Sequence, residues 1–337
     1  MNTLKNKQIG IGNSMVGTMG IGTWALGGPF FSGEKWVLPK GTPIGYGNAE
    51  DSVSIRAIHC AMECGAKLID TADAYGAGHC ERVIGRAIKG RRDRVFLATK
   101  FGNVIDEDRK ELIGQQWSER FIRDACEASL RRLQTDVIDL YQLHISDLEI
   151  DAAQGVAEVL ELLREEGKIR SFGWSTDDPD RAGSWSGYGG ATVAQFNMNV
   201  FQPAPEMLEI CRENRFAALI RLPLAMGLLS GKYTPESRLP ENDIRSAGPD
   251  WQRYFLKSGG ANRTWTDRLE SIREILRSDG RTLVQGALAW IWAQGDRVIP
   301  IPGIRNEEQA RENLGAIEFG PLSADQVAAI DTILERS

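Results

Sequence analysis

Short apolar segments alternate with longer amphipathic segments along most of the chain. The apolar segments have the length and β-branched content of strands, and the amphipathic segments repeat apolar residues at helical spacing. Strands are predicted at Met19–Trp24, Lys67–Asp70, Val95–Lys100, Val137–His144, Ile169–Ser175, Thr192–Asn197, Ala217–Leu222 and Val298–Pro302. Helices are predicted at Asp51–Cys64, Glu81–Ile88, Ser118–Leu133, Ala152–Glu166, Pro205–Asn214, Arg281–Gln294 and Glu307–Leu314. This alternation is typical of βαβ units and a parallel sheet.

The units follow one another without a linker, which favours a closed (β/α)8 TIM barrel over an open sheet. We therefore expect one α/β domain over residues 1–337, with an N-terminal hairpin within residues 1–16 and a C-terminal helix within 323–337. Asp180–Tyr188, rich in Gly, Ser and Trp, is the one weak helix of the series. Two long segments, Gly27–Asn48 and Leu224–Asn262, follow strands 1 and 7, where barrels carry functional loops.

A rival architecture is suggested by Gly20-Ile-Gly22-Thr-Trp-Ala25, which matches a loose G-x-G-x-x-G/A dinucleotide fingerprint after a strand. A Rossmann fold requires a helix to begin within this motif. The following Gly27-Gly-Pro-Phe-Phe-Ser-Gly33 breaks a helix at once, so we reject this alternative.

Charge and composition narrow the class of protein. The net charge is −6 and no Lys/Arg-rich run occurs, so the chain lacks the basic footprint of a nucleic-acid-binding protein. No segment approaches 18 apolar residues, and the amino end lacks the apolar core of a secretion signal. We expect a soluble cytoplasmic protein, and nothing in the sequence indicates its oligomeric state. The five cysteines include no tight CxxC-like pair, which favours buried reduced thiols over a metal site.

Polar residues end three of the predicted strands. Asp70, Lys100 and His144 each follow an apolar run, and Tyr75 begins the loop five residues after Asp70. The carboxyl ends of barrel strands converge on one face, so these four side chains are candidates for chemistry.

Together these groups suit the reduction of a carbonyl. A carbonyl that accepts hydride becomes an alkoxide and needs a proton donor at neutral pH. A nearby Lys100 ammonium is expected to lower the pKa of Tyr75, and Asp70 would keep that lysine charged and oriented. His144 would polarise the carbonyl oxygen. Taken singly, each residue has a structural interpretation: a buried Asp70–Lys100 salt bridge, a packed loop tyrosine, or a hydrogen-bonded rim histidine.

The motifs around these residues resemble those of the aldo-keto reductase superfamily. Asp70-Thr-Ala-Asp-Ala-Tyr75-Gly, Ala98-Thr-Lys100-Phe, Asp139-Leu-Tyr-Gln-Leu-His144 and Gly173-Trp-Ser175 stand in the family's order and spacing, and the likeness covers nearly the whole chain. The resemblance implies a (β/α)8 barrel, a catalytic tetrad of Asp70, Tyr75, Lys100 and His144, and hydride transfer from NADPH (NADP+).

The resemblance also implies cofactor-binding positions. Gly22, Thr23 and Trp24 match the end of the first strand, and Ser175, Thr176 and Gln195 match the region that binds the nicotinamide carboxamide. The pyrophosphate loop is matched by Pro223, Leu224, Gly227, Leu229, Ser230, Gly231 and Lys232. The adenosine site is matched by Gly303, Arg305, Gln309 and Asn313.

Arg305 opens a predicted helix, so a 2′-phosphate there would meet a guanidinium and a positive helix end. This favours NADPH over NADH, although Arg305 is also interpretable as a solvated arginine. Two positions depart from the family pattern. Arg221 replaces an aromatic residue that stacks on the nicotinamide, so it would either stack on the ring or pair with a substrate anion. Thr176 replaces a common asparagine, which predicts a weaker carboxamide contact.

The substrate is predicted to be a small carbonyl compound, either a sugar carbonyl or a cyclic ketone. Aromatic residues of the first long segment (Phe30, Phe31, Trp36, Tyr46) are expected to wall the pocket, and the segment carrying Trp251, Arg253, Tyr254 and Arg263 would close its other side. Arg245 is interpreted as surface charge. The alternatives are an NAD(P)-dependent sugar or alcohol dehydrogenase in the same barrel, and a cofactor-sensing binding subunit with slow chemistry.

Overall fold

The apolar segments form one sheet of eight parallel strands in the part of the chain that the computed structural model describes, residues 4, 7–249 and 251–336. The order in space follows the order in the chain, as expected of a barrel. The strands are β3 (Gly20–Gly22), β5 (Leu68–Asp70), β6 (Phe96–Phe101), β9 (Ile138–Leu143), β10 (Ile169–Ser175), β11 (Ala191–Asn197), β12 (Ala217–Arg221) and β13 (Val298–Pro300). The predicted fold class is confirmed.

The barrel closes where the first strand meets the last. Gly22 forms an isolated parallel bridge with Gly303, and its amide donates to the carbonyl of Pro302 over 2.9 Å. A Cβ atom on Gly22 would lie 2.7 Å from the carbonyl oxygen of Ile301. Glycine is required here because only a residue without a side chain lets the two backbones approach so closely.

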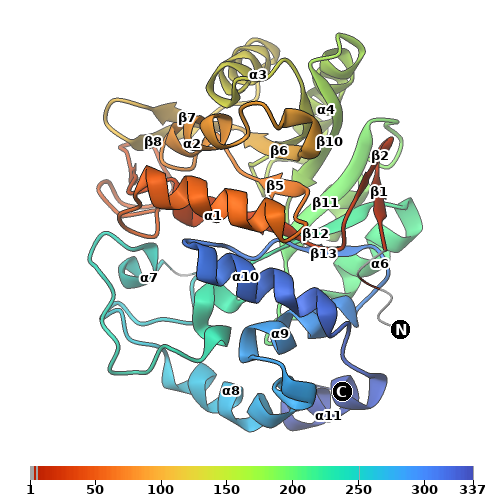
Figure 1. The fold of residues 1–337 in the computed structure, drawn as a ribbon. Coiled ribbons are helices and arrows are strands. Elements are labelled where there is room, and N and C mark those ends of the chain that lie inside the picture. Colours follow the sequence, from red (N-terminus) through yellow and green to blue (C-terminus); the bar gives the residue numbers. More distant parts are fainter. Residues whose placement is uncertain (1–3, 5–6, 250, 337) are drawn as a thin grey trace.

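Helices surround the sheet (Figure 1). They are α1 (Asp51–Glu63), α2 (His79–Ala87), α3 (Glu119–Leu133), α4 (Ile150–Glu165), α5 (Pro179–Gly183), α6 (Pro205–Asn214), α7 (Ile244–Ala247), α8 (Arg263–Leu276), α9 (Leu283–Trp292), α10 (Glu307–Gly315) and α11 (Ala324–Ile333). Thr282 and Ser323 form capping boxes with Gln285 and Gln326, and these fix the beginnings of α9 and α11. None of the described helices is long and apolar enough to cross a membrane.

Apolar side chains fill the barrel and the layer between strands and helices. At the amino end of the barrel, Ile9 and Val16 pack on inward-facing residues such as Leu68 and Leu140. They belong to the hairpin of β1 (Ile9–Ile11) and β2 (Ser14–Val16). In Figure 1 this hairpin lies on the opposite side of the molecule from α7 and from the β7–β8 hairpin (Asn103–Asp106 and Glu111–Gln115). The two faces of the barrel are therefore distinct.

The structure differs from the sequence-based prediction in two regions. Helix α8 and the strands β4 (Phe31–Ser32), β7 and β8 were not predicted. Strands β4 and β8 pair, so the first long loop is held against the segment that follows β6. The rejected Rossmann helix is indeed absent, since a short 3-10 turn, η1 (Trp24–Leu26), follows β3. Residues 1–3, 5–6 and 337 of the predicted terminal elements lie outside the described residues.

Candidate active site

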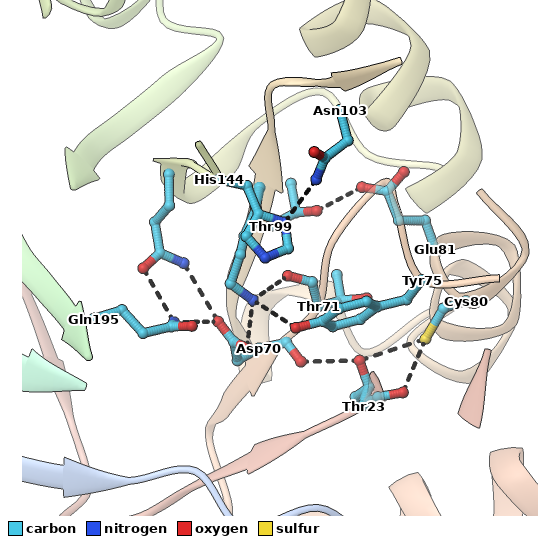
Figure 2. Close-up of polar contacts among 12 residues, drawn as sticks. Thr23, Asp70, Thr71, Tyr75, Cys80, Glu81, Thr99, Asn103, His144 and Gln195 are labelled. Atoms are coloured by element: carbon cyan, nitrogen blue, oxygen red, sulfur yellow. Dashed lines mark hydrogen bonds and ion pairs between the residues drawn. The ribbon is translucent and has the colours of Figure 1, made fainter. Parts of the chain in front are cut away.

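Polar side chains, Asp70 and Tyr75 among them, form one cluster at the carboxyl ends of the strands (Figure 2), and the fully buried Lys100 joins them by hydrogen bonds. The ammonium of Lys100, at the end of β6, donates to the Asp70 carboxylate over 2.6 Å and to the carbonyl of Thr71 over 2.8 Å. It also lies 3.3 Å from the Tyr75 hydroxyl. Burial alone would lower the pKa of Lys100, but Asp70 and Tyr75 raise it above its ordinary value. The lysine is therefore charged.

The pKa of Tyr75 departs from the sequence-based expectation. Burial raises it above its ordinary value of 10.0, and the opposing effect of the Lys100 ammonium does not compensate. The predicted lowering is therefore wrong in sign, because a sequence shows the neighbouring cation and not the loss of water around the phenol. Tyr75 remains a protonated phenol throughout the neutral range.

His144 completes the predicted set of four side chains. Its ring centroid lies 6.1 Å from that of Tyr75 in an edge-to-face arrangement, and its amide donates to the carbonyl of Phe101 over 2.8 Å. Burial, together with the cations Lys100 and Arg221, holds the pKa of His144 well below 6.5. The imidazole is therefore neutral at pH 7, with one N–H group to donate.

Two glutamines extend the cluster across the barrel. The amide nitrogens of Gln195 and Gln142 lie 2.8 and 3.3 Å from one carboxylate oxygen of Asp70. Gln142 was not singled out from the sequence, although it stands inside the motif that ends at His144. Every second residue of β9 faces the barrel interior, so alternation from His144 would have placed Gln142 on the same side.

The loop that carries Tyr75, residues 71–78 between β5 and α2, is called the tyrosine loop here, and a close approach of two glycines fixes it. Gly76 has a φ of +62°, and a Cβ atom there would lie 2.0 Å from the carbonyl oxygen of Gly27. On the other side, Thr23 donates from its hydroxyl to the carbonyl of Asp70 over 2.9 Å. The loops after β3 and β5 are therefore locked together beside Tyr75.

Aromatic rings line one side of Tyr75. Trp24 stacks on it with ring centroids 5.9 Å apart, and Tyr46 meets Trp24 edge-on at 5.0 Å. Of the other aromatics predicted to wall the pocket, Phe30 is instead buried in a small core beneath the tyrosine loop, with Trp36 packed against it. In the segment predicted to close the pocket from its other side, Tyr254 is buried against Phe201 and Trp265.

Arg245 contradicts its interpretation as surface charge. Its side chain is 6% exposed and pairs with Asp243 over 2.7 Å. The guanidinium also lies about 5 Å from the ring centroids of Tyr46, Tyr233 and Phe255. Tyr46 comes from the distant first long segment, whereas Tyr233 and Phe255 belong to the same segment as Arg245. This segment has no regular periodicity, so the sequence did not show that its turns bring the rings onto the guanidinium.

Some polar groups of the residues predicted to bind the nicotinamide already form hydrogen bonds or ion pairs within the protein. Ser175 is buried at the end of β10. The next hydroxyl, that of Thr176, donates to the carbonyl of Ser146 over 2.7 Å. Gln195 uses its amide nitrogen on Asp70, which leaves its amide oxygen as an acceptor. Arg221 pairs with Asp177.

The predicted phosphate loop has an unusual backbone. It forms η3 (Ala225–Ser230), in which Met226 and Gly227 have φ angles of 57° and 95°. Gly231 follows with a φ of 72°, and the Ser230 hydroxyl donates to the carbonyl of Gly227 over 2.7 Å. The Lys232 ammonium is exposed and lies 5.0 Å from the Tyr233 ring centroid.

The predicted adenosine residues form two hydrogen-bonded pairs, each joining the segment before α10 to the helix itself. The Asn313 side chain donates to the carbonyl of Gly303 over 3.2 Å, and the Arg305 amide donates to the Gln309 side chain over 2.8 Å. The Arg305 guanidinium donates to the backbone carbonyls of Tyr46 and Asn48. Among the described residues it forms no ion pair with a carboxylate, so its charge is not neutralised locally.

A separate cavity of about 600 Å³ opens at the other end of the barrel, lined by residues that include Ser14, Lys67, Asp139 and Arg170. None of the four clustered side chains lines it. Within the described residues, no group of three or more His, Cys, Asp and Glu side chains is placed to hold a metal ion.

Comparison with known proteins agrees with this geometry. The model of the Aldo/keto reductase family matches residues 18–335. The chain belongs to the aldo/keto reductase family. It is 32% identical to the aldo-keto reductase YhdN of Bacillus subtilis over 95% of this chain and 90% of that protein. It is 30% identical to the NADH-specific methylglyoxal reductase of Escherichia coli, covering 96% of each.

The fold comparison leads to the same family. An aldo-keto reductase of Klebsiella pneumoniae solved in complex with NADPH superimposes with a TM-score of 0.69 at 25% identity, covering 98% of this chain and 96% of that one. The protein is thus an oxidoreductase built on the barrel of this family.

Proposed function

We propose that the protein reduces an aldehyde or ketone to an alcohol, with hydride from NADPH and a proton from Tyr75. The observation that carries this proposal is the contact of one buried ammonium, Lys100, with both the Asp70 carboxylate and the Tyr75 hydroxyl. If Asp70 and Lys100 formed only a structural salt bridge, the tyrosine hydroxyl beside Lys100 would have no role. Tyr75 is only half-buried as a residue, and the proposal requires its hydroxyl to contact the bound carbonyl compound.

The site suits a phosphorylated dinucleotide. The Arg305 guanidinium has backbone carbonyls as partners and no carboxylate among the described residues, so a 2′-phosphate would supply its missing counter-charge. Gly227, Gly231 and Lys232 would hold the pyrophosphate, and the hydroxyl of Ser175 with the amide oxygen of Gln195 would hold the carboxamide. When bound, the nicotinamide supplies the hydride.

Proton transfer would proceed from a phenol that stays protonated at neutral pH. The raised pKa of Tyr75 does not prevent this, because an alkoxide is a much stronger base than a phenolate. Lys100 would stabilise the phenolate that remains, and Asp70 holds Lys100 in place. The neutral His144 would donate its N–H to the carbonyl oxygen and so orient the substrate.

We propose a sugar carbonyl or a cyclic ketone as substrate, in line with the aromatic rings of Trp24 and Tyr46 beside Tyr75. Flat apolar rings pack well on the faces of such molecules. The dependence on NADPH would favour reduction over oxidation in the cell.

The test is NADPH oxidation with a panel of aldehydes and ketones, run beside Tyr75→Phe. We expect turnover by the wild type and a loss of at least about 10²-fold in kcat for the variant, with unchanged NADPH affinity, since only the donor hydroxyl is removed. Tyr188→Phe is the matched control, because the Tyr188 hydroxyl bonds Gln154 near the protein surface. An active Tyr75→Phe enzyme would overturn the mechanism. Tight NADPH binding without turnover of any carbonyl would favour a cofactor-sensing subunit.

A second candidate, NADH-dependent dehydrogenase or reductase activity, is favoured by the NADH-specific relative of Escherichia coli. Affinities for NADPH and NADH in wild type and Arg305→Ala separate the two. We expect the variant to lose about 10- to 100-fold in NADPH affinity, the range for a charged hydrogen bond, with little change for NADH. Equal losses for both cofactors would contradict the assignment of Arg305 to a 2′-phosphate.

A further inference from the structure

A buried asparagine contacts the far side of the His144 ring. Asn103, the first residue of β7, is 3% exposed, and its amide nitrogen lies 3.3 Å from Nδ1 of His144. Figure 2 shows His144 between Asn103 and the group that contains Asp70 and Tyr75. The mechanism proposed above does not use Asn103.

The backbone on both sides fixes this contact. The amide of His144 donates to the carbonyl of Phe101, which ties the end of β9 to β6. Gly102 then turns the chain with a φ of +119°, and a Cβ atom there would lie 2.8 Å from the Ile145 side chain. Glycine at this position lets Asn103 lie against the imidazole. The backbone therefore places Asn103 beside the imidazole, and burial of its side chain restricts the other positions open to it.

We propose that Asn103 is a positioning residue that selects the tautomer of His144. An amide nitrogen can only donate, so Nδ1 must accept and the single proton of the neutral ring must sit on Nε2. Nε2 lies on the side of the ring away from Asn103. In Figure 2 this is the side of Tyr75, so the N–H group faces Tyr75. The role of this N–H towards a carbonyl oxygen rests on the function proposed above, whereas the tautomer itself does not.

Asn103 has no other described partner for its side chain. Its amide oxygen is buried and forms no hydrogen bond with the described residues. The arrangement with opposite polarity would place this oxygen against a protonated Nδ1 and leave Nε2 as an acceptor. In that arrangement His144 would have no N–H group facing the substrate. The two alternatives therefore make Nε2 a hydrogen-bond donor in one case and an acceptor in the other.

Nitrogen NMR of the histidine rings in the wild type decides between them. The chain has only three histidines, and those other than His144 are assigned with His59→Gln and His79→Gln. At pH 7 we expect His144 to be protonated on Nε2 and unprotonated on Nδ1. A proton on Nδ1 would overturn the proposal without any variant at position 103.

Asn103→Asp tests the consequence for turnover. A carboxylate accepts a hydrogen bond from Nδ1–H, so the single proton of neutral His144 would sit on Nδ1 and Nε2 would carry none. The rate of carbonyl reduction would then fall about 10²-fold at pH 8. Protonation of the ring restores the Nε2–H group, so the kcat of the variant should recover towards the wild-type value as the pH falls. NADPH affinity should stay unchanged. Asn214→Asp, on the outer helix α6, adds the same charge as a control.

The outcomes separate this inference from the proposed function. A pH profile of Asn103→Asp parallel to that of the wild type would reject the positioning role, because a purely structural defect has no reason to be reversed by protonation. If the wild type reduces no carbonyl compound yet carries the His144 proton on Nε2, the proposed function fails while the assignment of Asn103 stands.

Discussion

Lys100 shows how much a single side chain depends on its counter-charge. Its side chain is fully buried and lies 2.6 Å from the Asp70 carboxylate. We predict that Asp70→Asn lowers the free energy of unfolding by about 3–5 kcal/mol, the range for breaking a buried pair by removing one partner. Denaturant unfolding measures the change. Asp296→Asn removes the partner of Lys7 at a side chain that is 96% exposed, and should change stability by less than about 1 kcal/mol.

His144 links stability to pH. Its pKa is depressed in the folded protein, so its contribution is fully present above the ordinary value of 6.5 and is lost as the pH falls below it. In this range the unfolded chain binds a proton that the folded protein does not. We predict a slope of up to about 1.4 kcal/mol per pH unit between pH 6 and 5 from this group. If His144→Gln has the same slope as the wild type, this assignment is wrong.

Only part of the residue-level picture was accessible from the sequence. The strand-end rule grouped Asp70, Lys100 and His144 because polar residues that end apolar strands are visible as a pattern. The sign of the Tyr75 pKa shift was not, because burial arises from segments distant in the chain. The contact of Asn103 with His144 likewise depends on a turn at Gly102 that only the three-dimensional structure reveals.

At the scale of elements, the tyrosine loop depends on its contact with the loop after β3. A Cβ atom on Gly76 would collide with the carbonyl of Gly27, and its φ is positive. We predict that Gly76→Ala costs more than about 1–2 kcal/mol, the expense of the left-handed backbone alone, and lowers kcat by moving Tyr75. Unfolding and turnover measure the two effects. Gly155→Ala is the control, because its Cβ would meet nothing within 4 Å and its φ is not positive.

The strands of the barrel and most of its helices were predicted because each follows from a local periodicity. Helix α8 was missed directly after the second long segment, although Leu269, Ile272 and Leu276 are spaced helically and buried. The pairing of β4 with β8 was not predictable in the same way. It joins segments far apart in the chain, and neither segment carries a strong alternation.

At the scale of the molecule, the proposed active site lies at the carboxyl ends of the strands, and a buried ion-pair cluster that we expect to serve stability lies at their amino ends. Asp139, near the start of β9, is 1% exposed and bonds Arg92, Arg170 and the amide of Leu97 at 2.6–2.8 Å. We predict that Asp139→Leu lowers the free energy of unfolding by about 3–5 kcal/mol while kcat at saturating substrate is retained in the folded fraction. The exposed Asp136→Leu should change neither. A large loss of kcat in folded Asp139→Leu would contradict the separation of the two ends.

The bridge between Gly22 and Gly303, which closes the barrel, affects how often the barrel opens locally. Strands β3 and β13 meet through an isolated bridge, and the proposed cofactor residues lie on both sides of it. Local opening at this junction would therefore eject the cofactor, and saturation with NADPH at 100 times its Kd should suppress the opening by about 100-fold. The amide of Gly22 should exchange with deuterium more slowly by that factor, while amides of the β1–β2 hairpin, which can fray without disturbing the cofactor, keep their rates.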